Sequence, residues 1–377
     1  MRACHTEPVS WVLTIAGIMA LIVLHELGHF AAAKAVGMRV ERFSLFFPPK
    51  LIGIRRGETE YSIGAIPAGG YVKITGMSPI ELTQLDLRVA DRAYYMQQPW
   101  KRIVVILAGP AMNLLIAFVL FWAVLLSGSL NGAAVLQNLD PSVATVVSTS
   151  RVEAVEQGSP AAGVLRRGDR ILAVDGRRTS GEAARAAIAA DRCAGKLIDG
   201  CRAASPLRLT VQRGARTQTL TLYPRYNAND RRMLIGFNPG SRARPFGPLA
   251  AAGAALGEMW HTTVSTFSGV GRALTQSKVR HEVSSIVGIT NDAHETVQQG
   301  AARALVFLGF VSLVLAVMNL LPFLPLDGGH LLWSLLEKLR GRRVSLTGMY
   351  RYSSIGIILL VFLVINGVSN DISRLTG

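Results

Sequence analysis

The sequence predicts a helical membrane protein with about four transmembrane helices and one α+β domain outside the cytoplasm. Half of the 377 residues are hydrophobic and the mean hydropathy is +0.34. Only 17% are charged, whereas about a quarter are charged in soluble proteins. Apolar segments close to the ~20 residues that cross a bilayer also recur along the chain.

The four predicted spans cover residues 10–36, 102–127, 302–327 and 354–370. The first lacks a small-x-small cleavage site and contains histidines and a glutamate, so we expect it to be retained rather than removed as a signal peptide. The short connections, 37–101 and 328–353, are rich in lysine and arginine, which predicts a cytoplasmic position. Both termini and the long segment between spans two and three are then expected outside.

The net charge of +16 would suggest nucleic-acid binding in a soluble protein. Here the basic residues lie in loops beside apolar segments, and no basic–aromatic stripe or nucleic-acid motif accompanies them. The sequence therefore predicts the lipid bilayer as a partner and no nucleic acid. Three cysteines without a C-x-x-C motif argue against a cysteine-based metal or redox site.

A metal-binding motif interrupts the first span. HELGH places His25 and His29 at i and i+4 on one helix face with Glu26 beside them, which is the H-E-x-x-H pattern of two zinc ligands and a general base. Ionisable groups in an apolar span cost about 2.5–3.5 kcal/mol each, so a compensating metal is expected. The alternative is a pair of structural histidines satisfied by hydrogen bonds.

A catalytic zinc needs a third protein ligand and an open fourth position. Glu41, Glu58 and Glu60 follow the motif but lie beyond the apolar segment. Asp327 closes the third span, which crosses in the same direction as the first, so both reach the cytoplasmic half of the bilayer. Asp327 is therefore the predicted third ligand for Zn²⁺, and His330 beside it is expected to cap or support the site.

Four motifs follow one another along the chain: HELGH, YSIGAIPAGGYVKITG, AGPAMN and NLLPFLPLDGG, the last fitting N-x-x-P-x-x-P-x-D-G-G. In this order they resemble the site-2 protease family, intramembrane zinc metalloproteases of the M50 type that include the bacterial regulator of sigma-E protease. The resemblance implies cleavage within or beside the transmembrane helix of single-pass proteins, such as anti-sigma factors or remnant signal peptides, in the bacterial cytoplasmic membrane. The stretch SSIVGI (residues 284–289) departs from the family's usual Gly-Pro before V-G-I, so no role is transferred to it.

Residues 37–101 resemble the family's re-entrant β-hairpin region. We expect an unwound substrate to pair with this segment by strand addition, and the alternative is a loop that only covers the metal chamber. Asn113 and Asn319 are polar groups in apolar spans that either hold helices together or orient the substrate or the zinc ligands. The candidate substrate-binding residues are Ile63, Gly64, Gly69, Gly70, Tyr71, Asn113 and Asn319.

Residues 143–225 contain alternating strand-like stretches, and Glu156–Ser180 resembles a PDZ domain. A PDZ groove takes a peptide strand or a C-terminus, and here we favour a size gate that admits only substrates already trimmed outside the membrane. Cys193 and Cys201 lie on the oxidising side, so they form either a local disulfide or two free thiols. Residues 245–300 read as amphipathic helices on the outer leaflet or packed on this domain.

These features predict an intramembrane zinc metalloprotease. The alternative is a non-catalytic PDZ scaffold whose metal cluster is vestigial. The complete set of His25, Glu26, His29 and Asp327 favours the protease, because a degenerate site would have lost at least one member. A metal transporter fits less well, since one three-ligand site with an adjacent base suits hydrolysis.

Overall fold

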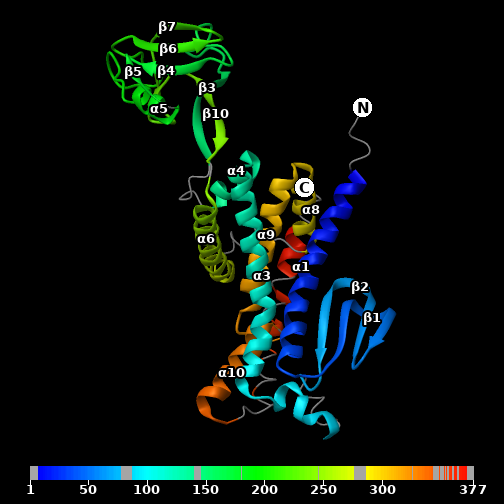
Figure 1. The fold of residues 1–377 in the computed structure, drawn as a ribbon. Helices are drawn as coiled ribbons and strands as arrows, with labels where there is room; N and C mark the ends of the chain where they lie inside the picture. Colours follow the sequence, from blue (N-terminus) through cyan, green and yellow to red (C-terminus); the bar gives the residue numbers. More distant parts are fainter. Residues whose placement is uncertain are drawn as a thin grey trace. The chain divides into compact units, whose positions relative to one another are not determined.

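The computed structural model describes most of the chain, namely residues 7–77, 87–139, 146–179, 181–244, 246–275, 286–324 and 326–342, with shorter stretches between 348 and 371. The chain forms two compact units (Figure 1). One combines Met1–Ser127 with Gly247–Gly377, and the other is Gly128–Phe246. The structure describes most of the predicted fourth span, 354–370, and every residue it describes there is helical.

Among the described residues, three helices of the first unit are long and apolar enough to cross a membrane: α1 (Glu7–Ala35), α3 (Pro99–Ser127) and α9 (Ala301–Asn319). Their most apolar windows have mean hydropathies of 1.9, 2.5 and 2.3. α3 packs against both α1 and α9. The helices are apolar all round because lipid and neighbouring helices are both apolar surroundings, and the chain is a membrane protein.

The third span ends earlier than the sequence suggested. α9 stops at Asn319 rather than continuing to residue 327, because Pro322 has no N–H to extend the helical hydrogen bonds. A separate helix, α10 (Asp327–Arg340), then occupies the segment that was expected to be a loop, and it ends at Gly341, whose φ is 66°. The helical spacing of its leucines is the signal that the loop prediction overlooked.

The sheet of the first unit contains β1 (Val40–Arg56) and β2 (Thr59–Ile74), each folded back on itself. The 42–45 part of β1 pairs on one side with residues 60–63 and on the other with residues 70–73. Among the described residues, the last part of β2 therefore pairs on one side only. Its other edge faces α1, against which β2 packs.

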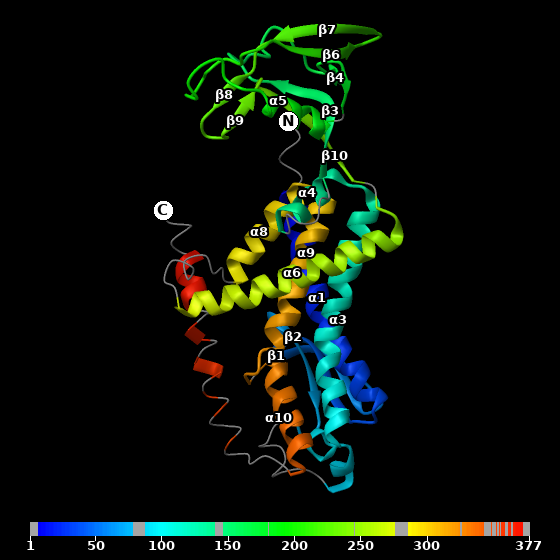
Figure 2. The ribbon, with the colours of Figure 1, turned by 90° about the vertical axis from the view of Figure 1, so that its left-hand side faces the viewer.

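Two further helices of this unit cover the spans. α6 (Pro248–Thr275) packs against α3 and α9, and Figure 2 shows it running across them rather than along them. α8 (Ile286–Gln298) packs against α1, where the His294 ring stacks on Trp11 at 3.9 Å between ring centroids. Between β2 and α3 lie two short 3₁₀ helices, η1 (Leu87–Arg92) and η2 (Tyr94–Met96).

The second unit is built around one antiparallel sheet with the strand order β10-β3-β4-β6-β7. β10 lies beyond residue 225, so the predicted boundary at 225 left out one strand of this sheet. An apolar core that includes Val152, Ile171 and Leu209 lies beneath it. Its elements are α4 (Leu130–Leu139), β3 (Val146–Val155), β4 (Arg170–Val174), β5 (Arg177–Arg178), α5 (Gly181–Ala189), β6 (Leu207–Arg213), β7 (Arg216–Leu222), β8 (Arg225–Asn227), β9 (Arg232–Leu234) and β10 (Phe237–Ala243).

The aspartate of the G-D-R-I stretch stabilises this unit. Buried Asp169 accepts hydrogen bonds from Arg213 Nε at 2.8 Å and from the Arg166 backbone N–H at 2.9 Å. Arg213 lowers the pKa of Asp169 below its usual value. The pairing therefore stabilises the fold above the unfolded-state pKa of about 3.9 and is lost as the pH falls through the lowered folded-state pKa. Nearby, Cys193 and Cys201 are joined as a disulfide.

Candidate metal centre

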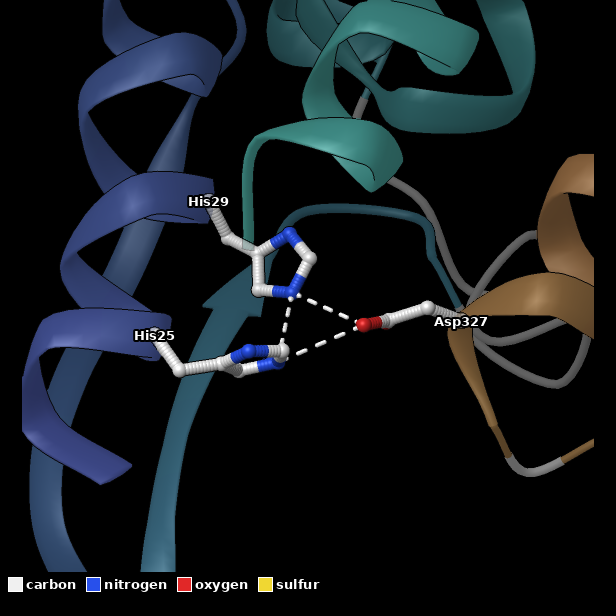
Figure 3. A group of neighbouring side chains, drawn as sticks. All are labelled: His25, His29 and Asp327. Carbon is white, nitrogen blue, oxygen red and sulfur yellow. Dashed lines mark hydrogen bonds and ion pairs between the residues drawn. The ribbon is translucent and has the colours of Figure 1, made fainter. Parts of the chain in front are cut away.

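The metal ligands come from the two ends of the chain. His25 and His29 lie one turn apart on α1, with their rings edge to face and 4.8 Å between centroids. Asp327 is the first residue of α10 and points at both imidazoles from the opposite side (Figure 3). Both histidines are buried and the aspartate is half-buried, so the three groups face one another largely out of solvent.

The three ligand atoms have the spacing of a tetrahedral zinc site. His25 Nε2 and His29 Nε2 lie 3.3 and 3.2 Å from Asp327 Oδ2, and 3.2 Å from each other. Ligands at the usual 2.0–2.1 Å from tetrahedral zinc would be about 3.3 Å apart. The donor set therefore fits zinc and leaves one coordination position for water or substrate.

The hydrogen bond on the far side of His29 fixes its tautomer. His29 Nδ1 lies 2.8 Å from the Val105 carbonyl oxygen, which can only accept, so Nδ1 carries the proton. Neutral His29 then presents the lone pair of Nε2 to the other two ligand atoms. Such a convergence of ligand atoms is suited to a metal ion, and a backbone carbonyl behind a ligating histidine is a common support.

Asn113 supports His25 in the same way. It is fully buried on α3, and its side-chain amide lies 3.1 Å from His25 Nδ1. Its Oδ1 has no hydrogen-bond partner among the described residues. Amide oxygen and nitrogen are easily exchanged in assignment, and with the oxygen toward His25 the amide accepts a hydrogen bond from Nδ1–H. Of the two roles predicted for Asn113, this contact favours orientation of the zinc ligand.

Two glycines, which the sequence analysis did not single out, allow α1 and α3 to approach at the site. A Cβ on Gly28 would lie 2.4 Å from the Ala108 carbonyl oxygen, and one on Gly109 would lie 2.2 Å from His29 Nε2. The space for the imidazole therefore exists only because residue 109 has no side chain. Its signal in the sequence is a glycine inside an otherwise apolar span.

We expect Gly109→Ala to abolish zinc binding and proteolysis, because the methyl group would occupy the position of His29 Nε2. Gly253→Ala in α6 is the matched control, since a Cβ there meets nothing within 4 Å and replacing a helical glycine by alanine stabilises by about 0.5–1 kcal/mol. Metal content and cleavage of a membrane substrate, measured on both variants, check this. Normal zinc content in Gly109→Ala would contradict it.

The position of Asp327 depends on the two glycines that follow it. A Cβ on Gly328 would lie 2.2 Å from the Leu321 carbonyl oxygen, and one on Gly329 would lie 2.6 Å from the Leu324 backbone nitrogen. The D-G-G sequence therefore lets the connection after α9 fold against the start of α10. This explains why the ligand is followed by residues without side chains.

Glu26 lies between the metal ligands and the sheet. A Cβ on Gly70 would be 3.3 Å from Glu26 Cγ, and the backbone of Val72 hydrogen-bonds to Glu26. The carboxylate is half-buried and is not one of the three ligands. It therefore stands beside the metal position next to the free edge of β2, where a general base is needed.

The other predicted substrate-binding residues have mixed surroundings. Gly64 is enclosed within the sheet, because a Cβ there would lie 2.1 Å from the Phe47 carbonyl oxygen, whereas Ile63 is 42% exposed. Tyr71 accepts a hydrogen bond from Arg42, and Gly69 has a φ of +145°. Asn319 is the last residue of α9.

The three glutamates considered as alternative ligands are engaged elsewhere. Glu41 pairs with Lys73, Glu58 with Lys34 and Arg92, and Glu60 with Arg42 and Lys50. His330 packs its ring against Tyr94, with 6.0 Å between centroids, and does not belong to the ligand group formed by the described residues. Among these acids, Asp327 alone joins the histidines.

Comparisons with known proteins agree with this geometry. The sequence model of peptidase family M50 matches residues 13–363. The zinc metalloprotease Rip1 of Mycobacterium tuberculosis is 30% identical over 93% of this chain and 91% of its own length. Putative zinc metalloproteases of Clostridium acetobutylicum and Campylobacter jejuni are 29% and 26% identical over 96% and 98% of this chain, and over 96% and 95% of their own lengths.

Among solved structures, the PDZ domain of an SdrC-like protein from Listeria monocytogenes matches 25% of this chain and 88% of that domain, at 18% identity and a TM-score of 0.20. That score is too low to establish a shared fold. The family match covers nearly the whole chain, and His25, His29 and Asp327 form a group that could hold a metal ion. The chain therefore belongs to peptidase family M50 and is a zinc metalloprotease.

Proposed function

We propose that the chain cleaves peptide bonds within or beside the transmembrane segment of single-pass membrane proteins, in the bacterial cytoplasmic membrane, after their outer part has been trimmed. Anti-sigma factors and remnant signal peptides are substrates of this kind. The N-terminus and residues 128–246 lie outside the cytoplasm in this proposal, because the basic short connections favour the cytoplasm.

The depth of the ligands is the observation that carries the proposal. The apolar part of α1 begins at Ser10, and His25 follows fifteen residues later, about 22 Å along the helix axis. The hydrocarbon core is about 30 Å thick. A substrate bond would therefore enter the bilayer region to reach the metal, and with the N-terminus outside, as proposed, that bond lies in the cytoplasmic half.

The side chains around the candidate metal centre support hydrolysis. When bound, zinc polarises the scissile carbonyl and lowers the pKa of water at the site. Glu26 is placed to accept the proton of the attacking water and to deliver it to the leaving amine. Val105 and Asn113 hold the two imidazoles in the tautomer that binds metal, and half-burial of the site limits the access of bulk water.

The free edge of β2 gives the substrate a place to unwind. A transmembrane helix hides its carbonyls in hydrogen bonds, so the cleaved segment must become extended before attack. Residues 70–74 pair with β1 on one side, and their other edge lies on the side of Glu26. Strand addition uses a sheet edge of this kind. The alternative, a sheet that only covers the chamber, needs no such edge.

Cross-linking distinguishes these two roles. We expect single cysteines at Tyr71, Val72 and Lys73 to cross-link to a bound substrate with alternating efficiency along the strand, because successive strand residues face opposite sides. A Glu26→Gln background would keep the substrate intact during the measurement. A cysteine at Leu249, which is 88% exposed on α6, is the control. Uniform cross-linking along residues 71–73 would favour the covering role.

The cut position tests the proposed function itself. We expect the purified protein in lipid to cleave a doubly tagged, outwardly trimmed single-pass substrate within the cytoplasmic half of its apolar segment, and to spare the same substrate with its outer domain intact. Mass spectrometry of both products gives the position. Cleavage confined to the aqueous segments, or in the outer half of the bilayer, would contradict the proposal or its orientation.

A non-catalytic scaffold remains the alternative function. A scaffold would rely on peptide binding by residues 128–246 alone. The convergence of His25, His29 and Asp327 at 3.2–3.3 Å would then have no function. The intact ligand geometry therefore favours the protease.

A further inference from the structure

One buried ion pair joins the helix that carries Asp327 to the helix that supports the histidines. Arg102, in the first turn of α3, pairs with Glu337 on α10, and the two side chains are only 3% and 6% exposed. The Arg102 guanidinium also lies 5.8 Å from the centre of the Tyr95 ring, which restricts its orientation. Such burial is unusual for arginine and glutamate and requires a partner.

The connection to α9 does not set the position of Asp327 by itself. α9 ends at Asn319 and α10 begins at Asp327, so no continuous helix carries the third span into the ligand. The position of the carboxylate along the axis of α10 therefore depends on how α10 packs on its neighbours, as well as on the close packing of the connection against Gly328 and Gly329. α3 is one of these neighbours, and it also provides the Val105 carbonyl and Gly109 beside His29.

Apolar packing alone does not fix the position of α10 along its own axis closely enough to hold a metal ligand in place. Leu331 and Trp333 pack against the cluster around Tyr94 and Ile106, but hydrophobic contact is non-directional. A slip of one residue along a helix is about 1.5 Å, whereas ligand distances in a metal site must hold to about 0.2 Å. A hydrogen-bonded ion pair such as that between Arg102 and Glu337 is directional, because an N–H···O bond restricts both distance and angle.

We infer that the Arg102–Glu337 pair is a positioning pair that sets the register of α10 against α3 and thereby holds Asp327 at the distance from His25 and His29 that zinc requires. Glu337 lies ten residues after the ligand, about 15 Å along α10. Arg102 lies three residues before Val105, on the helix that orients His29. The pair therefore ties the two halves of the ligand set together without touching the metal.

The test uses the full-length protein in lipid nanodiscs, stripped of metal and titrated with Co²⁺, whose visible spectrum reports the ligand geometry, followed by competition with Zn²⁺. The principal variant is Arg102→Met with Glu337→Met, since replacing a buried ion pair by apolar residues is often neutral for stability. The exchanged pair, Arg102→Glu with Glu337→Arg, tests rescue. The control is Asp169→Leu with Arg213→Met, which removes an ion pair from the other unit.

We expect the double methionine variant to stay folded, to bind Zn²⁺ at least about tenfold more weakly, as changes to outer-shell partners do, and to show a changed Co²⁺ spectrum. The exchanged pair should recover both properties, and the control should change neither. Wild-type affinity and spectrum in the methionine variant, with or without a lower melting temperature, would overturn the inference. If the methionine variant unfolds, an exchanged pair that restores the fold without restoring metal affinity would overturn it as well.

Discussion

Glu26→Gln is expected to lower proteolysis about 10²- to 10⁴-fold, the usual contribution of a general base, without loss of zinc. The glutamine keeps the size of the side chain and can still meet the Val72 backbone, but it cannot take a proton. Because Glu26 is not one of the three ligand residues, metal content should equal that of the wild type.

The measurement compares cleavage of one trimmed single-pass substrate by wild type and variant, with zinc determined on the same samples. Glu182→Gln, an exposed glutamate at the start of α5, is the control for loss of a carboxylate. Product formed equally by Glu26→Gln and wild type would exclude Glu26 as the base. Equal residual product in a metal-free sample would instead reveal a contaminating protease.

Asp327→Asn is expected to have an equally large effect by a different route, through the loss of zinc. The variant leaves two neutral imidazoles to hold a divalent cation, without the carboxylate oxygen now 3.2–3.3 Å from both. Metal affinity should therefore fall by more than the about 10- to 100-fold that follows changes to outer-shell partners. Proteolysis should fall with it and return in part at high zinc concentration.

Metal content by mass spectrometry after dialysis checks this, with the exposed Asp230 changed to asparagine as the control. The pair of results separates two roles: Glu26→Gln keeps the metal and loses the chemistry, whereas Asp327→Asn loses both. Full zinc occupancy in Asp327→Asn would remove this residue from the ligand set.

The meeting of His25, His29 and Asp327 could be predicted from the sequence, because the spacing of the motifs determines much of the geometry. His25 and His29 share a helix face by the period of the helix alone. Asp327 followed from the direction of the spans and from an acid at the end of an apolar segment. The helices α1, α3 and α9 could be predicted from composition, since a run of about twenty apolar residues is typical of a transmembrane helix.

What supports the ligands could not be predicted, because it depends on contacts between distant segments. No sequence pattern around Val105 predicts that its carbonyl oxygen contacts His29. The sequence also does not predict that Gly109 packs against the His29 imidazole. The pairing of Arg102 with Glu337 spans 235 residues. The helix at 327–340 was overlooked because its basic end suggested a loop, although its leucines have helical spacing.

The sequence separation between the candidate ligands also determines when the site can form during synthesis of the chain. His29 and Asp327 are 298 residues apart, so the three side chains cannot come together until Asp327 has been made. At about 5–20 residues per second, roughly 15–60 s separate the synthesis of the first ligands from that of the last. The nascent chain is thus an incomplete hydrolase throughout membrane insertion, and it becomes able to cut its neighbours only when its own helices have assembled.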